Sequence, residues 1–245
     1  MKVSVFPDYA TLSASVADEL LALLKTKPGA VICLASGNSP KLSCELFVKN
    51  IKDSQTNISQ FFFVGLDEWV GLGPETYGSC HYDFKTRLFD PLRIPATQYH
   101  VFNGQAEDLA KECEVMDNII REKGGIDLMI VGIGMNGHIG FNEPGVDFGL
   151  LSHVIELDAV TKRVGQKYFT EQLSLSKGIT LGLGHLIASK KVILMADGTA
   201  KAGVIKRAVE DEVNTSFPAS IMQLHNNGYI FIDEGAGSQL TNIER

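Results

Sequence analysis

The chain has 245 residues, of which 44% are apolar and 21% charged, so it is long enough to bury a sizeable core as an ordinary globular protein. Its 22 basic and 29 acidic residues give a formal net charge of −7, and no block of lysine or arginine occurs. Nucleic acid is therefore not expected as a partner, because a phosphate backbone is bound by clustered positive charge.

Apolar segments of strand length alternate with amphipathic segments of helix length, and no repeat or low-complexity linker interrupts them. The expected strands cover residues 2–6, 30–36, 61–66, 126–134, 153–158, 191–197 and 228–233. The expected helices cover residues 12–25, 40–50, 107–123 and 200–209. Most of the strands lack polar alternation, as buried parallel strands do. We therefore expect residues 1–245 to form a single α/β domain, with an open, mainly parallel sheet and helices on both faces.

Ligands of open parallel sheets bind outside the carboxyl ends of the strands, and four loops at such positions carry unusual residues. The first loop reads LASGNSPKL and spans residues 34–42. Gly37 allows the backbone to turn its N–H groups outward, while Ser39 and Pro40 predict the cap and the first residue of a helix. Because N–H groups at a helix N-terminus bind anions, the loop predicts either a phosphate site or a plain helix cap.

The second loop reads GLDEWVGLG and places two adjacent carboxylates, Asp67 and Glu68, after an apolar run. Successive side chains of an extended segment point to opposite sides, so one carboxylate can face a site while the other faces away. Between Leu66 and Trp69, a buried carboxylate with a raised pKa could act as a general base. Acidic residues after strands are also common on plain surfaces.

The third loop, GIGMNGHIGFNEPG, spans residues 132–145 and allows two interpretations. Its first six residues fit the dinucleotide fingerprint G-x-G-x-x-G, and Glu156 and Asp158 lie at about the distance of a ribose-binding acid. That fingerprint needs a helix of several turns, which the glycines and the proline of residues 140–145 disfavour. The alternative is a catalytic loop in which a carboxylate such as Glu143 holds His138 for proton transfer near neutral pH.

The fourth loop, ADGTAKAGVIKRAVE, places Lys201 in the first turn of an expected helix. A cation is unfavourable there because the N-terminal end of the helix dipole is positive. A bound anion would remove the conflict, and a solvated lysine is the plain alternative.

The cysteine pattern and the absence of long apolar runs indicate the cellular compartment of the protein. The four cysteines form no Cys-x-x-Cys pair, which predicts reduced thiols rather than a zinc site or a disulfide framework. The N-terminal stretch MKVSVFPDYA lacks the apolar segment of a signal peptide, and no apolar run approaches the roughly 20 residues that span a bilayer. We expect a cytoplasmic protein with no membrane partner and no bound metal.

Five motifs at these loops resemble the glucosamine-6-phosphate deaminase family: LASGNSP, LDEWVGL, GIGMNGHIGFNEPG, GITLGLG and the Lys201 loop. The resemblance extends over nearly the whole chain. It implies a Rossmann-like fold, a hexosamine 6-phosphate as substrate, and a monomer or homo-oligomer without cofactor. The implied reaction is ring opening followed by aldose-to-ketose isomerisation with loss of ammonia, which makes residues 132–145 a catalytic loop.

The resemblance also implies a role for each matching residue. Asp67 would move a proton between C2 and C1, and His138 would open the pyranose ring with Glu143 and Asn136 orienting it. The substrate phosphate would be held by Ser36, Gly37, Asn38, Ser39, Lys201 and Lys167. A sugar phosphate does need an anion site at one end and an acid/base pair at the other.

Three positions depart from the family pattern. Asn136 stands where some members carry Asp, and Lys167 stands where others carry Arg, a change from a bidentate fork to a point charge. Trp69 in LDEW, together with YGSCHYDF, resembles the galactosamine-6-phosphate isomerase branch, so the C4 epimer of the substrate stays open. Two rivals also stay open: a 6-phosphogluconolactonase, which shares the fold, and a sugar-phosphate effector domain, which would need a helix-turn-helix.

Overall fold

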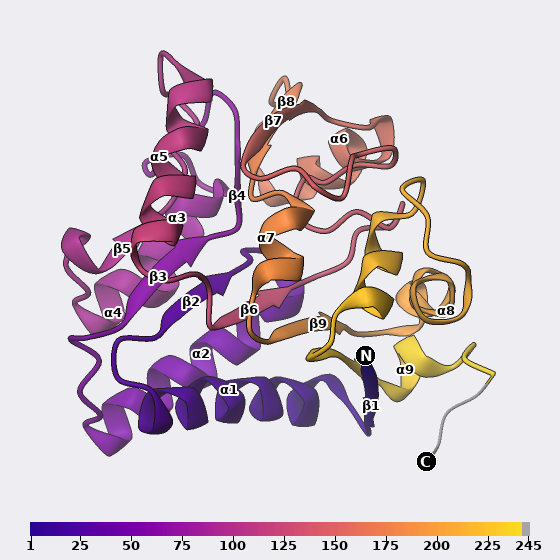
Figure 1. Cartoon of the computed structure of the whole chain (residues 1–245), viewed down its shortest axis with the longest axis horizontal. Helices are drawn as coiled ribbons and strands as arrows, with labels where there is room; N and C mark the ends of the chain where they lie inside the picture. The colour runs from indigo at the N-terminus through magenta and orange to yellow at the C-terminus, as the bar shows by residue number, and fades with distance from the viewer. Residues whose placement is uncertain (242–245) are drawn as a thin grey trace.

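The computed structural model describes residues 1–241 and is built on a seven-stranded sheet (Figure 1). The strand order is β1-β10-β9-β6-β2-β3-β5, and every neighbouring pair is parallel. The expectation of a mainly parallel sheet is confirmed. The strands are β1 (Lys2–Phe6), β2 (Val31–Leu34), β3 (Phe62–Gly65), β5 (Tyr99–His100), β6 (Leu128–Val131), β9 (Val192–Ala196) and β10 (Gly228–Asp233).

The central strands are apolar because both of their faces are covered. Every residue of β2, β3, β6 and β9 is buried. The chain runs outward through β2, β3 and β5, then returns beside β2 and runs the other way through β6, β9 and β10. The direction of strand addition therefore reverses between β2 and β6, and loops diverge at the carboxyl ends of these two strands.

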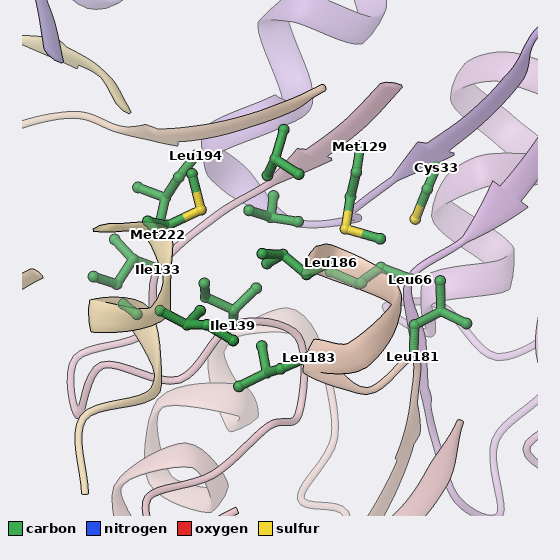
Figure 2. Packing of buried hydrophobic residues seen from close by; sticks show 14 of the residues in the cluster. Cys33, Leu66, Met129, Ile133, Ile139, Leu181, Leu183, Leu186, Leu194 and Met222 are labelled. Atoms are coloured by element: carbon green, nitrogen blue, oxygen red, sulfur yellow. The ribbon is translucent and has the colours of Figure 1, made fainter. Parts of the chain in front are cut away.

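Helices cover both faces of the sheet, as expected (Figure 1). One face packs on α1 (Tyr9–Thr26) and α2 (Asn38–Ser54), whose apolar residues share a cluster with Ile130 of β6. The other face packs on α5 (Leu109–Glu122), α7 (Leu183–Ala188) and α8 (Ala202–Glu210), which share a cluster with Met129. Figure 2 shows Leu186 of α7 near Met129 of the sheet and Leu183 near Ile139, within this second cluster.

Shorter helical segments connect these layers. The chain between β4 and β5 contains α3 (Cys80–Phe84), a π-helix η1 (Lys85–Phe89), α4 (Asp90–Leu92) and the 3₁₀ turn η2 (Ala96–Gln98). The later segments are α6 (Ala159–Gly165), η3 (Gln166–Tyr168), η4 (Thr199–Lys201), η5 (Pro218–Leu224) and α9 (Glu234–Gly237). None of the helices in residues 1–241 has both the length and the apolar character that a bilayer crossing requires.

A second, three-stranded sheet lies apart from the first and corrects one expectation. Its strands β4 (Asp67–Trp69), β8 (Lys177–Thr180) and β7 (His153–Glu156) pair antiparallel in the order β4-β8-β7. We expected residues 153–158 to join the parallel sheet, and this is wrong. No residue of β7 is fully buried, so the segment suits a small partly exposed sheet rather than the interior of a covered one.

Candidate active site

A cleft of about 740 Å³ opens at the carboxyl edge of the parallel sheet, where the loops after β2, β3, β6 and β9 meet. Ligands of open α/β proteins bind at such an edge, beside the point where the strand order reverses. Eight predicted site residues line the cleft: Ser36, Gly37, Asn38, Ser39, Asp67, His138, Lys167 and Lys201. The other two, Asn136 and Glu143, approach His138 from outside the cleft lining.

One end of the cleft is formed by the start of α2. The helix begins at Asn38 with Gly37 as its cap residue, and no side chain caps it. The prediction that Ser39 is the cap is wrong, because Ser39 is already helical and its hydroxyl donates to Asp197 Oδ1 at 3.1 Å. Gly37 has φ +102°, a conformation that L side chains rarely adopt, so the local backbone determines where the helix starts.

Two lysines line the same end. Lys201 Nζ donates to the carbonyl oxygen of Ile133 at 2.5 Å, which holds the ammonium group against the loop after β6. Burial and then the neighbouring charge of Lys167 lower the pKa of Lys201, and Asp197 opposes them. Lys201 ends the 3₁₀ turn η4 and α8 begins at Ala202, so the helix expected from residue 200 starts two residues later.

Asp67 lies in the cleft and Glu68 points away from it, as alternation along an extended strand predicts. Burial raises the pKa of Asp67 to about 6, against the opposing effects of the Cys80 thiol and His138. Glu68 is 1% exposed and accepts three backbone N–H donors, from Trp69 at 2.8 Å, Cys80 at 3.0 Å and His81 at 2.7 Å. Burial raises the pKa of Glu68 to about 7 in spite of these donors.

His138 has a neutral amide as its nearest partner. Its Nδ1 lies 2.7 Å from Asn136 Oδ1, whereas Glu143 Oε2 is 3.6 Å away. The Asn136 amide donates to Glu143 Oε2 at 2.8 Å, so the carboxylate orients Asn136, which in turn faces the imidazole with its oxygen. Burial raises the pKa of Glu143, but contacts with His138, Thr161 and Asn136 outweigh it and hold that pKa below its usual value.

The loop that carries His138 is anchored on both sides by core residues. Ile133 and Ile139 are buried, and Figure 2 shows both side chains within the apolar cluster beside α7. Gly134 permits the imidazole to lie directly over the backbone, since a Cβ there would come within 2.2 Å of the His138 ring. Residues 132–152 contain no helix, so the dinucleotide interpretation of the glycine pattern is wrong.

Several residues beside the cleft were not assigned a role from the sequence. Thr161 Oγ1 lies 3.1 Å from His138 Nδ1, and the Cys80 thiol donates to Asp67 Oδ1 at 3.6 Å. Asp83 Oδ2 accepts from the N–H of Gly37 at 3.5 Å and is paired with Arg87. The motif YGSCHYDF contains Cys80 and Asp83, but the contacts of Cys80 with Asp67, of Thr161 with His138 and of Asp83 with Gly37 join separate segments of the chain, so these contacts could not be predicted. Within residues 1–241, no three His, Cys, Asp or Glu side chains are grouped so that they could share a metal ion.

Comparison with known proteins agrees with the resemblance of the motifs. Residues 8–231 match the model of the family described as glucosamine-6-phosphate isomerases/6-phosphogluconolactonase. A glucosamine-6-phosphate deaminase of Bacillus pumilus (strain SAFR-032) is 38% identical over 97% of this chain and 99% of its own length. Another, of Geobacillus sp. (strain WCH70), is 34% identical over 100% of this chain and 98% of its own length.

Solved structures place the fold in the same family. A monomeric glucosamine-6-phosphate deaminase superposes with a TM-score of 0.94 at 31% identity, covering 98% of this chain and 100% of its own. The 6-phosphogluconolactonase of Trypanosoma brucei superposes with a TM-score of 0.79 at 16% identity, covering 98% of both chains, and shares the fold alone. By sequence over nearly its full length and by fold, the chain belongs to the glucosamine-6-phosphate isomerase/6-phosphogluconolactonase family.

Proposed function

We propose that the protein is a glucosamine-6-phosphate deaminase, which converts the aldose amine to the ketose 6-phosphate and releases ammonia. The observation that carries this proposal is one cleft that has the partly buried carboxylate of Asp67 and the imidazole of His138 at one end, and a helix N-terminus with two lysines at the other. The names of the full-length relatives support the choice of substrate. The four free cysteines suit a reducing compartment, and we propose the cytoplasm.

Ring opening is assigned to His138. Its Nδ1 faces Asn136 and Thr161, which leaves Nε2 as the atom for the substrate. In this proposal Nε2 takes the proton of the C1 hydroxyl and returns it to the ring oxygen as the C1–O5 bond breaks, giving the open-chain aldehyde. The Glu143 carboxylate contributes by orienting the Asn136 amide that fixes the tautomer of the imidazole.

Isomerisation is assigned to Asp67. The carboxylate removes the proton from C2 while the aldehyde oxygen takes a proton from the 2-ammonium group of the substrate, and the resulting enolamine takes a proton at C1 from the same carboxyl group. The product is an imine at C2, which water hydrolyses to the ketone and ammonia. A carboxyl group with a pKa of about 6 suits both directions of transfer near neutral pH, because it is a stronger base than an ordinary aspartate.

Phosphate binding is assigned to the N-terminal turn of α2 and to Lys201 and Lys167. Backbone N–H groups of residues 37–39 and the hydroxyl of Ser36 are the proposed donors, and the helix dipole favours the negative charge. Lys167 is exposed at the cleft, with Nζ 5.2 Å from the centre of the Tyr168 ring. Where other members of the family carry an arginine that can bind a phosphate through two N–H groups, Lys167 would bind it through a single ammonium group.

Galactosamine 6-phosphate is the second candidate substrate. Trp69 and Cys80, which belong to the motifs that resemble the galactosamine branch, both line the cleft. An ammonia-release assay with the two hexosamine 6-phosphates side by side, and hydrolysis of 6-phosphogluconolactone as a third arm, tests the assignment. We expect ammonia from glucosamine 6-phosphate in excess of its C4 epimer. Lactone hydrolysis without ammonia from either amine would refute the proposed function.

A further inference from the structure

The side chain that contacts the Asp67 carboxylate most directly is a thiol. Cys80 Sγ donates to Asp67 Oδ1 at 3.6 Å, a separation suited to a sulfur donor. Within residues 1–241, no other side-chain or main-chain donor forms a hydrogen bond to this carboxylate. One carboxylate oxygen is therefore held by a weak neutral donor, and the other is left for the cleft.

The position of the thiol is fixed from the far side of the same strand. Glu68 accepts the N–H of Cys80 at 3.0 Å and the N–H of His81 at 2.7 Å, which ties the start of α3 to β4. Ser79 caps α3 by accepting from Tyr82 N at 3.0 Å, and its hydroxyl donates to the carbonyl of Gly73 at 2.8 Å. Cys80 is 4% exposed and packs in the apolar cluster of that face. The thiol therefore has little freedom to leave Asp67.

From these contacts we infer that Cys80 is a positioning residue, which aims the Asp67 carboxylate and sets its acidity through the S–H donor. A thiol suits this task because it is a weak donor. A hydrogen bond to the charged form of an acid lowers its pKa, so several strong donors would make Asp67 a poor base, while none would leave it free to rotate. Burial raises the pKa of the Cys80 thiol well above its usual value, which keeps the proton that the contact requires.

Other titratable groups also face Asp67, and the test must leave them in place. They come from β2, β4, η3 and the loop after β6, and are Cys33, Glu68, Tyr168 and His138. Substitution of Cys80 removes one donor and keeps all four. The Cys113→Ala variant is a matched control, because it removes the same sulfur from a buried site in the cluster on the opposite face of the sheet.

The titration of Asp67 tests the inference without any turnover. The carboxyl ¹³C resonance of Asp67, assigned by its loss in Asp67→Asn, is followed against pH in the wild type, Cys80→Ala, Cys80→Ser and Cys113→Ala. We expect the acid dissociation constant of Asp67 to fall roughly three- to tenfold in Cys80→Ala, the effect of one ordinary hydrogen bond. In Cys80→Ser, which keeps a donor, the acid dissociation constant of Asp67 should equal or exceed that of the wild type. In Cys113→Ala it should equal that of the wild type. A wild-type titration in Cys80→Ala, or an alanine-like titration in Cys80→Ser, would overturn the inference.

A measurement on the wild type alone covers the case in which a variant does not fold. The infrared S–H stretching band of Cys80 should move to higher frequency when Asp67 is protonated, because a carboxylic acid accepts a weaker hydrogen bond than a carboxylate. S–H bands that are all unchanged across the titration of Asp67 would overturn the inference.

The catalytic consequence rests on the proposed function and is measured separately. The acid limb of kcat/KM for ammonia release should move to higher pH in Cys80→Ala by the same factor as the ¹³C titration, and return in Cys80→Ser. If no amine substrate is turned over, the proposed function fails while the spectroscopic result still decides the role of Cys80. If turnover occurs but its acid limb does not follow Asp67, the catalytic part of the inference is wrong.

Discussion

At one end of the cleft the proposed phosphate site is made mainly from backbone, whereas at the other end the proposed acid and base are partly buried side chains. The phosphate end uses the first turn of α2, which is partly open to solvent and has no side-chain cap. The acid/base end uses Asp67 and His138, whose partners come from α3, α6 and the loop after β6. The phosphate end needs a chain conformation, and the acid/base end needs particular functional groups.

This difference predicts different kinetic consequences at the two ends. Phosphate is held alike in the ground state and the transition state, so changes at that end should appear in KM. Proton transfer occurs only in the transition state, so changes at the other end should appear in kcat. Four of the five predictions below test this contrast and one tests the effect of the Asp67 carboxylate on stability, in order of decreasing expected effect.

Asp67→Asn should give the largest loss. The amide keeps the size and hydrogen bonding of the carboxylate but cannot take the C2 proton, so kcat should fall about 10²- to 10⁴-fold while KM changes only several-fold. Steady-state ammonia release measures both constants. Asp53→Asn, an exposed carboxylate on α2 that pairs with Lys49, serves as the control and should be unchanged. Near-normal kcat in Asp67→Asn would show that Asp67 is not the base that takes the C2 proton.

His138→Gln should slow turnover of the cyclic sugar about 10²-fold, because the ring oxygen must receive a proton as the C1–O5 bond breaks. An analogue that cannot close the pyranose ring should lose much less activity. The Thr161→Val variant removes one neighbour of Nδ1 and keeps Asn136, so its loss should be smaller. Equal losses for the cyclic substrate and the open-chain analogue would assign His138 to another step.

Lys201→Ala should raise KM roughly 10- to 100-fold with little change in kcat, the effect of losing one charge-assisted contact. The matched control is Lys206→Ala, because Lys206 lies on α8, the helix that follows Lys201, and pairs with Glu210 away from the cleft. Initial rates over a wide range of substrate separate the two constants. A fall in kcat at saturating substrate with unchanged KM would contradict the phosphate role.

The partly buried carboxylate of Asp67 should also lower the free energy of unfolding, and Asp67→Asn should raise it again. Asp67 has a folded-state pKa of about 6 against a usual value of 3.8, so ionisation favours the unfolded chain. Below about pH 4 Asp67 is protonated in both the folded and the unfolded state, so no stability is lost. The loss of unfolding free energy grows between about pH 4 and pH 6 and is complete above about pH 6. The asparagine variant should therefore gain on the order of 2 kcal/mol in unfolding free energy above pH 6 and nothing in acid. Urea denaturation at several pH values measures this, and an equal or lower stability of the variant at neutral pH would be inconsistent with it.

Ser39→Ala should have the smallest effect, at most about threefold in kcat/KM. Its hydroxyl already donates to Asp197, and the backbone N–H that is proposed to hold the phosphate is kept. Gly37→Ala should cost more, because a residue with a Cβ is strained at φ +102°. If kcat/KM fell as much in Ser39→Ala as in Lys201→Ala, the phosphate end would depend on side chains rather than on backbone. The proposed difference between the two ends would then be wrong.

The sequence predicted the parallel sheet and the loops of the cleft, because buried strands are apolar runs and the loops after them carry glycine and polar residues. It did not predict β4 or β8, because β4 has only three residues and these two strands pair across segments far apart in the chain, with Asp67 opposite Thr180. The capping rule failed at Ser39 because Gly37 takes a conformation that starts the helix earlier. The contacts of Cys80 and Thr161 could not be found, because they depend on where α3 and α6 pack.

The pairing of β1 with β10 has a consequence for how the protein folds. These strands pair with Lys2 opposite Tyr229, so the first strand made finds its partner only when the last strand has been made. Contacts this distant in sequence form late and slow the folding of a chain. During synthesis, the edge of β9 that pairs with β10 stays open until residues 228–233 have been made, and an unpaired strand edge of this kind favours aggregation.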